Sequence, residues 1–483
     1  MDIVAREIRE RDYSCDALIL PFCEGDANVY QSISPSTSRL INKVFSREFS
    51  GKPNEVVMIP AADDIKPRRI LFVGIGKKGD VTAERLRQAG GKAASYAQNS
   101  GMKKLALSTG VIASLNISPS VFVEGSLLGL YKFRKYSAGD DKKAVEAMTV
   151  LSKVSKSFKD EIRYVQTVSK SVWFARDLIN TPANDMTPTH LAKTSLSLRR
   201  KNLSVRILDG KDAEKLGMNS YLSVARGSKE PPKFIVLDYN GSGKKPLVLI
   251  GKSITFDSGG LSLKPADSME KMKYDMAGGA AVLGVFKAVS ELRMPVHLVG
   301  LLAATENLPG GSATKPGDVV RSLEGKTIEI VNTDAEGRMT LVDAIGYAKK
   351  FKPYAIIDIA TLTGACSIAL GDGAIAMMGN EGQLMDRIRR AGDITYERVW
   401  KMPLFDEYKE YLKSDIADLK NTGGRTGSLV SSAYFLKEFA GDTPWAHLDI
   451  AGTAWSEKDK PYIPKGAAGI GVRLLTNMIK ESI

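Results

Sequence analysis

The segment Thr327-Ile-Glu-Ile-Val-Asn332-Thr-Asp334-Ala-Glu336-Gly-Arg338 joins a short apolar run, Ile328 to Val331, to a group of polar and charged side chains. A helix is predicted at Leu341 to Phe351, ending before Pro353, and a further strand at Tyr354 to Ile359. A strand, a polar loop, a helix and another strand, in this order, are typical of an α/β fold.

The same alternation is predicted over the preceding hundred or so residues. Strands are predicted at Lys233 to Tyr239, Leu247 to Ile250 and Val296 to Ala303, and a helix at Met276 to Leu292. Units of this kind build a largely parallel sheet covered by helices, whose ligands gather in loops at the carboxyl ends of the strands. The polar motif after Val331 lies at such an end.

The first part of the chain shows a separate α/β pattern. Its strands are predicted at Ala17 to Phe22, Val56 to Ile59, Ile70 to Val73 and Leu105 to Leu107, and a helix at Ala83 to Gln98. Because 483 residues exceed the size at which one hydrophobic core usually stops growing, two domains are expected.

A polar, Lys-rich stretch from Asp140 to about Phe174 separates the two patterns. Apolar residues recur in it at helical spacing, which predicts a long helix. We therefore expect an α/β fold of two domains, each a mostly parallel or mixed sheet flanked by helices. The expected parts are an N-terminal domain at 1–140, a connecting helix at 141–174 and a C-terminal domain at 175–483.

The composition is that of an ordinary globular protein, with 43% hydrophobic and 25% charged residues. The net charge of +13 raises nucleic acid as a partner. However, basic clusters such as Arg199-Arg-Lys201 are not interleaved with aromatic residues, so a solvated basic surface is favoured over a nucleic-acid site.

The sequence favours a cytoplasmic protein without a membrane span. The first ten residues carry both signs of charge and no apolar segment, so a secretory signal is not expected. The apolar stretch Ala355 to Met378 contains Asp358 and Asp372, which favours a buried strand plus loop. The 3 cysteines are too few and too scattered for a disulfide framework.

Three glycines, Gly74, Gly76 and Gly79, match the G-x-G-x-x-G pattern of dinucleotide sites directly after a predicted strand. The acidic residue expected about 20 residues further on is missing, because that region reads Lys104-Leu-Ala-Leu-Ser-Thr-Gly110. A tight turn between a strand and a helix is therefore the favoured interpretation.

Lys252, Asp257 and Lys264 lie in one apolar, Gly-rich segment that ends at Pro265. Gly259-Gly260 and this proline argue against a helix, so a loop after a strand is predicted. Buried charges of this kind are unfavourable unless they pair or bind a ligand. Solvation at the surface is the alternative explanation.

Two further carboxylate groups have alternative explanations as well. Asp275 precedes a predicted helix, where a capping carboxylate is stabilising. In an extended segment Asp334, Glu336 and Arg338 project to one side, and a surface ion pair with the arginine is one explanation. The other is a pair of divalent metal ions, since close carboxylates repel unless cations lie between them.

A metal site in this chain is expected to be rich in oxygen ligands, because only 3 histidines are present and none has metal-binding spacing. Carboxylates suit Mg or Mn, and zinc where one nitrogen ligand is available. Lys252 can supply that nitrogen only as a neutral amine, which requires burial and an adjacent metal to lower its pKa.

At these residues the sequence resembles the leucyl aminopeptidase, or cytosol aminopeptidase, family, whose signature corresponds to Asn332 to Arg338. The likeness extends from about Arg176 to Leu475, and before it only scattered features around Gly74 match. Further matching segments are Arg176 to Asn184, Gly227 to Pro232, Lys315 to Val320, Ala360 to Ala365, Asn421 to Arg425 and His447 to Trp455.

The resemblance implies an aminopeptidase that uses two divalent metal ions, Mn or Zn with Mg or Co as alternatives. Asp257 and Glu336 would bridge the ions, Lys252 and Asp275 would complete one site, and Asp334 would complete the other. In the family's mechanism a metal-bound water attacks the peptide carbonyl, while the substrate's free amine binds one metal.

The resemblance also implies roles for residues that do not bind metal. Lys264 matches an electrophilic lysine that stabilises the oxyanion, and Arg338 matches an arginine that holds bicarbonate, the proposed general base. Met272, Thr361 and Gly364 match positions of a side-chain pocket, which implies a preference for leucine and other apolar residues.

Family members are typically homo-hexamers, and the N-terminal domain is expected to serve oligomerisation or regulation. The sequence departs from the family at Ser253, commonly a glycine, and at Met339-Thr340, commonly an aliphatic pair; neither change removes a ligand. The alternatives are a two-metal phosphoesterase, against which Lys252 and the length of the resemblance argue, and nucleic-acid binding.

Overall fold

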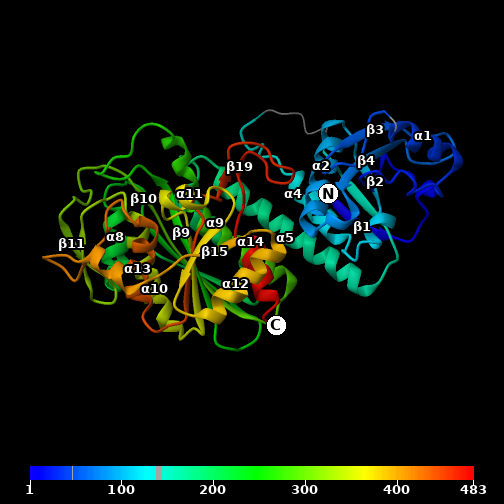
Figure 1. Cartoon of the computed structure of the whole chain (residues 1–483). Helices are drawn as coiled ribbons and strands as arrows, with labels where there is room; N and C mark the ends of the chain where they lie inside the picture. Colours follow the sequence, from blue (N-terminus) through cyan, green and yellow to red (C-terminus); the bar gives the residue numbers. More distant parts are fainter. Residues whose placement is uncertain (46, 138–143) are drawn as a thin grey trace. The chain divides into compact units, whose positions relative to one another are not determined.

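The computed structural model describes residues 1–45, 47–137 and 144–483, which divide into two compact units (Figure 1). Unit 1 comprises Met1–Lys170 with Glu457–Lys465, and unit 2 comprises Ser171–Ser456 with Gly466–Ile483. Each unit is built on its own sheet with helices packed around it, so the expected two-domain α/β fold is confirmed.

Unit 1 contains a 6-stranded sheet, in which neighbouring strands are parallel apart from an antiparallel edge pair. The predicted strands and the predicted helix are present. The apolar runs at 17–22, 70–73 and 105–107 are buried, and the edge run at 56–59 is half-buried. The strands, in sheet order, are β1 (Asp2–Arg6), β6 (Ala147–Leu151), β5 (Lys104–Ser108), β2 (Ala17–Cys23), β4 (Arg69–Gly76) and β3 (Val56–Pro60). The helices are α1 (Pro35–Phe45), α2 (Ala83–Asn99), α3 (Gly110–Ala113) and α4 (Ser120–Gly129).

The helix predicted at 141–174 is wrong in its first part. Strand β6 lies there instead, paired in parallel with both β1 and β5, and residues 141–143 are outside the described residues. Met148 and Leu151 fit helical spacing, but the run between them is buried on both faces of the sheet. Helix α5 begins only at Lys156 and ends at Asn180. Just before its start, the Ser155 hydroxyl accepts a hydrogen bond from Phe158 N.

Unit 2 contains an 8-stranded mixed sheet whose central strands are parallel. In sheet order they are β15 (Val399–Lys401), β14 (Ile375–Gly379), β17 (Trp445–Asp449), β13 (Ala355–Ala360), β9 (Leu247–Asp257), β10 (His297–Asn307), β8 (Lys233–Asn240) and β7 (Leu203–Leu208). A 3-stranded sheet consists of β11 (Asp318–Arg321), β12 (Thr327–Ile330) and β16 (Leu419–Lys420). A 2-stranded sheet consists of β18 (Trp455–Ser456) and β19 (Gly466–Ala467).

Helices cover both faces of the unit 2 sheet (Figure 1). On one side lie α8 (Asn219–Ala225), α10 (Glu336–Ala348) and α13 (Ser428–Ala440), and on the other α9 (Ala277–Leu292), α12 (Gly382–Thr395) and α14 (Val472–Lys480). The remaining helices are α6 (Pro188–Leu196), α7 (Gly210–Lys215) and α11 (Gly364–Leu370). The core therefore lies in two layers, one against each face.

Strand β9 is longer than predicted and carries part of the expected loop. It runs to Asp257 and pairs with β10 as far as Asn307, so Lys252 and Asp257 are strand residues. The β-branched Ile254 and Thr255 explain this extension. The loop begins after Asp257, where Gly259 and Gly260 adopt φ of +90° and +67°.

The glycine pattern at the end of β4 has a packing role. A Cβ at Gly74 would lie 2.0 Å from the carbonyl oxygen of Lys52, so the neighbouring backbone requires glycine there. Gly76 adopts φ +85°, and helix α2 begins only at Ala83. The turn is thus longer than that of a dinucleotide site, in which the third glycine opens the helix.

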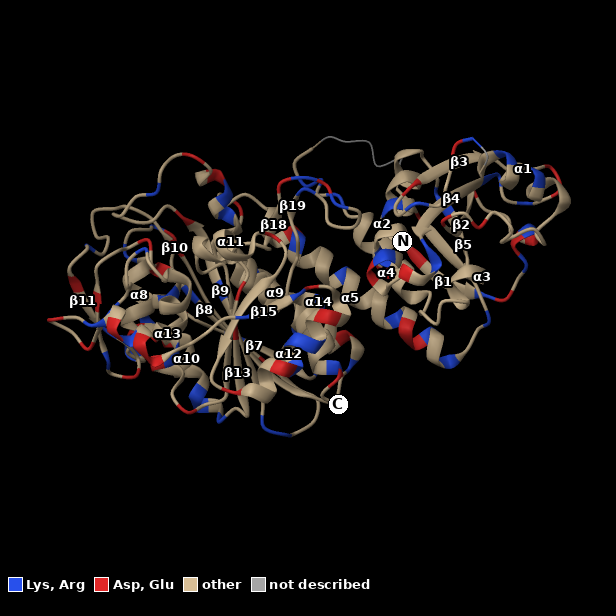
Figure 2. Cartoon of the chain, viewed as in Figure 1, with Lys and Arg blue, Asp and Glu red and all other residues tan. Residues whose placement is uncertain are grey.

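Charged residues of both signs are interspersed along both units (Figure 2). Basic and acidic residues therefore occur together along the chain in both units. Among the helices of the described residues, none has the length and apolar character needed to cross a membrane. The stretch from Ala355 to Met378 forms β13, α11 and most of β14.

Candidate active site

The charged side chains singled out in the sequence converge in unit 2, at the carboxyl end of β9 and the start of α10. They come from four segments, because β9, the loop after it, the 3-10 helix Met269–Met276 (η4) and the β12–α10 loop meet there. The residues are Lys252, Asp257, Lys264, Asp275, Asp334 and Glu336.

Lys252 lies between two carboxylates in the interior. Its Nζ is 2.8 Å from Asp275 Oδ1 and 2.8 Å from Glu336 Oε1, and it donates a hydrogen bond of 3.0 Å to the Thr361 carbonyl. The side chain is only 4% exposed. A Cβ at Gly337 would lie 2.4 Å from Lys252 Cε, so the lysine passes directly over the first turn of α10.

Lys264 pairs with the other two carboxylates of the group. Its Nζ is 3.0 Å from Asp257 Oδ2 and also contacts Asp334 Oδ1. Unlike Lys252, it remains 22% exposed. One carboxylate oxygen each from Asp257, Asp334 and Glu336 lie within 4.8 Å of one another, a spacing that a metal ion can bridge.

Four carboxylates therefore share this interior with two lysines. Burial acts to raise the pKa of each carboxylate, but Lys252 and Lys264 outweigh burial at Glu336 and lower its pKa. Burial, with Glu336 close by, raises the pKa of Asp257 to about 6. Burial also raises the pKa of Asp275 well above its usual range, although Lys252 opposes this. Burial alone would lower the pKa of Lys252, but the surrounding carboxylates outweigh it and raise that pKa. A cation must therefore displace the proton before Lys252 can act as a neutral ligand.

The expected extended arrangement of Asp334, Glu336 and Arg338 is wrong. Strand β12 ends at Ile330, and α10 begins at Glu336, so the last two lie in its first turn. Both are buried, at 3% and 5% exposure, which is inconsistent with a surface ion pair. The helix start directs Glu336 toward Lys252, and the preceding loop directs Asp334 toward Lys264.

Asp275 does not act as a helix cap. Met276 occupies the N-cap position of α9 without a side-chain cap hydrogen bond. Asp275 Oδ1 pairs with Lys252 and accepts a hydrogen bond of 2.6 Å from the Thr361 hydroxyl. Asp275 Oδ2 is buried and has no hydrogen-bond partner among the described residues, so it is free to accept a further ligand.

Arg338 is a buried cation whose polar partners are uncharged. Its Nη1 donates to the Asn421 carbonyl at 2.7 Å and its Nη2 to the Ser432 hydroxyl at 2.6 Å, while Nε has no hydrogen-bond partner among the described residues. Burial lowers the pKa of Arg338 to about 10, with Glu336 and Asp449 opposing the shift. A buried guanidinium with an unused N–H is suited to bind a small anion.

The structure places one of the three expected pocket residues in direct contact with the charged group. Thr361 contacts Lys252 through its carbonyl and Asp275 through its hydroxyl. Met272 is half-buried in η4, and Gly364 is exposed at the first residue of α11.

Three uncharged residues that received no role from the sequence connect the loops of the site. Asn307 Nδ2 donates to Asp257 Oδ1 at 2.8 Å and to the Thr333 carbonyl at 3.0 Å. The Thr333 hydroxyl donates to the Gly259 carbonyl at 2.7 Å, and Asn421 contacts the loop before α10. The available signals were the position of Asn307 near a strand end and the motif that begins at Asn421.

Comparison with known protein families identifies the family of this chain. Residues 173–476 match the catalytic domain of the cytosol aminopeptidase family, and residues 24–139 match its N-terminal domain. The chain belongs to the cytosol aminopeptidase family. As a member of it, the chain is a peptidase, a metal-dependent hydrolase that acts at N-termini.

Similar proteins cover nearly the whole chain. A probable cytosol aminopeptidase of Geobacter sp. (strain M21) is 48% identical over 90% of each chain. The cytosol aminopeptidase of Pseudomonas aeruginosa (strain PAO1) is 40% identical over 100% of this chain and 99% of its own. Among solved structures, the bottromycin maturation enzyme BotP in complex with Mn has a TM-score of 0.87 and 31% identity over 97% of this chain and 100% of its own.

For a cytosol aminopeptidase, the residues present fit a pair of divalent cations. The donor set consists of carboxylate oxygens and one lysine nitrogen, and four carboxylates face only two ammonium groups. The unpartnered Asp275 Oδ2 offers a further buried ligand atom. Such an excess of buried negative charge is compensated by cations that bind oxygen.

Proposed function

We propose that this member of the cytosol aminopeptidase family removes leucine and other apolar residues from the N-termini of peptides. The observation that carries the proposal is the convergence of Lys252, Asp257, Asp275, Asp334 and Glu336 at one interior point, with the more exposed Lys264 beside it. These five residues would hold two divalent ions. When bound, the ions would supply Lewis acidity toward the peptide carbonyl and would lower the pKa of a water.

Manganese or zinc is the proposed metal, with magnesium or cobalt as alternatives. The oxygen-rich donor set favours hard cations, and the lysine nitrogen makes zinc acceptable. The similarity to BotP in complex with Mn supports manganese.

The two lysines have different proposed roles because they differ in exposure. Lys252 is 4% exposed and enclosed by Asp275 and Glu336, which suits a ligand. Lys264 is 22% exposed, so its ammonium group can reach a bound substrate. There it would donate hydrogen bonds to the carbonyl oxygen as negative charge develops on it.

Arg338 would bind bicarbonate through its unused Nε–H, while Asn421 and Ser432 orient the guanidinium. Bicarbonate, when bound, would supply a general base, which the histidine-poor site lacks. In Arg338→Lys the charge remains but the planar set of donors is lost. We expect kcat to fall by about tenfold or more and the response to added bicarbonate to disappear, with metal content retained.

The measurement for Arg338→Lys is initial rate against bicarbonate concentration in carbonate-depleted buffer, together with metal analysis. Arg389→Lys is a matched control, because Arg389 pairs with Asp393 on the surface at 3.1 Å. An unchanged bicarbonate response in the Arg338 variant would rule out anion binding by this arginine.

Met272, Thr361 and Gly364 would border the pocket for the first side chain. Discrimination among apolar residues should be modest, because one methylene contributes only about 1–3 kcal/mol. We also propose a cytoplasmic homo-hexamer, in which unit 1 serves assembly or regulation. The typical assembly of the family and the name of the relatives support this.

Wild-type protein is expected to hydrolyse leucine p-nitroanilide, to lose this activity after chelation and to regain it with Mn²⁺. N-acetyl-leucine p-nitroanilide should remain intact, since its amine is blocked. A panel of leucine, alanine, lysine and glutamate anilides measures the preference. Activity that survives verified metal removal, or cleavage of the acetylated substrate at a similar rate, would contradict the proposal.

A further inference from the structure

Asn421 is a fully buried amide at the end of β16, and all of its side-chain hydrogen bonds go to the loop before α10. Its Oδ1 accepts from Val331 N at 3.0 Å and from Asn332 N at 3.4 Å. Its Nδ2 donates to the Asn332 carbonyl at 2.7 Å and to the Ala335 carbonyl at 3.5 Å. The amide thus contacts both ends of the loop that carries Asp334.

The backbone of Asn421 makes two further connections. Its N–H donates to the Glu329 carbonyl at 2.8 Å, which fixes it beside β12. Its carbonyl oxygen accepts a hydrogen bond of 2.7 Å from Arg338 Nη1. One residue therefore holds the carboxylate loop by its side chain and the buried guanidinium by its main chain.

We propose that Asn421 is a positioning residue that couples the two halves of the site, the metal-binding carboxylates and the anion-binding arginine. This inference rests on the proposed function. Within the loop from Asn332 to Ala335, Asp334 N donates to Asn332 Oδ1 at 2.8 Å and Ala335 N to the Asn332 carbonyl at 3.2 Å, and Thr333 is bonded to Gly259 and Asn307. Asn421 adds side-chain hydrogen bonds at the two ends of this loop. Without the amide, the spacing of Asp334 and Glu336 and the orientation of Arg338 would relax together.

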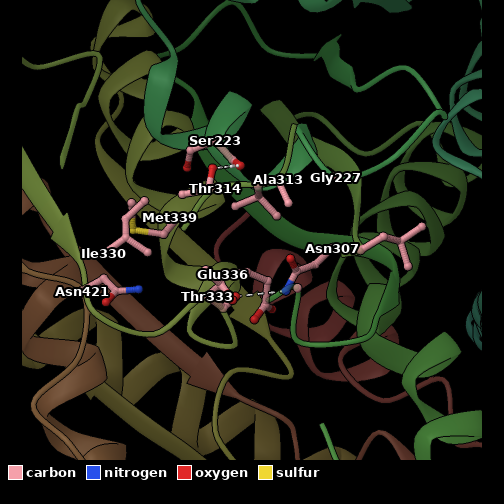
Figure 3. A pocket seen from close by; sticks show the side chains of 13 residues that line it. Ser223, Gly227, Asn307, Ala313, Thr314, Ile330, Thr333, Glu336, Met339 and Asn421 are labelled. Atoms are coloured by element: carbon pink, nitrogen blue, oxygen red, sulfur yellow. Dashed lines mark hydrogen bonds between the residues drawn. The ribbon is translucent and has the colours of Figure 1, made fainter. Parts of the chain in front are cut away.

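Asn307 offers a contrast within the same pocket. Both asparagines line one pocket together with Thr333 and Glu336 (Figure 3). Asn307 donates to Asp257 and to the Thr333 carbonyl, and these bonds do not involve Arg338. It is therefore expected to support the carboxylates alone, whereas Asn421 supports both groups.

The test compares Asn421→Ala, Asn307→Ala and Asn380→Ala in the full chain. Asn380 is the matched control, because its amide makes three loop-clamping hydrogen bonds, to the Gly441 and Thr443 carbonyls and from Trp445 N, outside the site. Each protein is titrated with Mn²⁺ while its thermal midpoint is followed, and kcat and KM are measured against bicarbonate concentration.

Asn421→Ala is expected to weaken Mn²⁺ binding by about 10–100-fold and to raise the bicarbonate concentration for half-maximal rate by a similar factor. Its kcat should fall far more than its KM rises. Asn307→Ala should weaken Mn²⁺ binding alone, and Asn380→Ala should lower only the thermal midpoint. If Asn421→Ala does not fold, Asn421→Asp keeps an acceptor oxygen, loses the amide donors and is expected to shift both dependences in the same direction.

Mn²⁺ and bicarbonate dependences of wild-type strength in the folded Asn421 variant would overturn the inference and leave Asn421 a purely structural residue. A shift in the Mn²⁺ dependence alone, or in the bicarbonate dependence alone, would overturn the proposed coupling. The wild-type titration separates this from the proposed function: absence of Mn²⁺-dependent hydrolysis there refutes the proposed function, whereas losses confined to the Asn421 variants support the coupling.

Discussion

Glu336→Gln is expected to lower the hydrolysis of leucine p-nitroanilide by about a thousandfold, which corresponds to about 4 kcal/mol of transition-state stabilisation. Glu336 is the carboxylate at the centre of the site, 2.8 Å from Lys252 Nζ and within 4.8 Å of the oxygens of Asp257 and Asp334. The amide has the same shape but no charge and only one acceptor oxygen. It cannot compensate two cations, so the metal content should also fall.

Metal analysis after equilibrium dialysis against Mn²⁺ measures the second part of this prediction. Glu438→Gln is a suitable control, because Glu438 also faces two lysines, Lys326 at 3.4 Å and Lys409 at 3.2 Å, on the outer part of α13. That change should leave activity and metal content unaffected. Full metal occupancy in Glu336→Gln, with normal activity, would refute the metal-bridging role.

Lys264→Ala is expected to lower kcat by about 10²–10³-fold, the usual effect of removing one donor to a developing oxyanion. The same substitution should not weaken metal binding. Lys264 pairs with Asp257 and Asp334, so its ammonium group competes with cations for these carboxylates. Removal of that competition should leave Mn²⁺ binding unchanged or tighter.

The measurements for Lys264→Ala are kcat, KM and a Mn²⁺ titration of the thermal midpoint. Lys287→Ala serves as the control, since Lys287 pairs with Glu291 within α9 at 2.5 Å, away from the site. Loss of Mn²⁺ binding in proportion to the loss of kcat would make Lys264 a structural residue and not an electrophile.

Regular elements of this chain could be predicted well where apolar runs are bounded by polar turns, as in β2, β8 and β13. The prediction failed at Ala147–Leu151. The apolar spacing of this segment fits a helix, but the segment forms an inner strand between β1 and β5. Local spacing does not reveal sheet neighbours that are distant in the sequence, and here Ala147 pairs with Asp2 and Lys104.

The charged residues that the structure brings together were singled out in the sequence, but surface solvation, helix capping and a surface ion pair remained as alternatives there, and the ligand set came from the resemblance to the family. Their geometry was not predicted. The sequence pattern treated Asp334, Glu336 and Arg338 as an extended segment, whereas Glu336 and Arg338 belong to the first turn of α10. Asn307 and Asn421 received no role for a different reason. Uncharged amides are common in loops, and only the fold shows that these two connect segments distant in sequence.

The pairing of Lys252 and Lys264 with the four carboxylates has a consequence for how the enzyme would acquire metal. Each carboxylate already has an ammonium neighbour from the chain itself, so newly made polypeptide can complete its fold before it acquires metal. With Lys252 as the proposed ligand, metal binding would be an exchange in which Lys252 gives up its proton to solvent. Acidity opposes that exchange. The supply of metal would then determine when the protein becomes active.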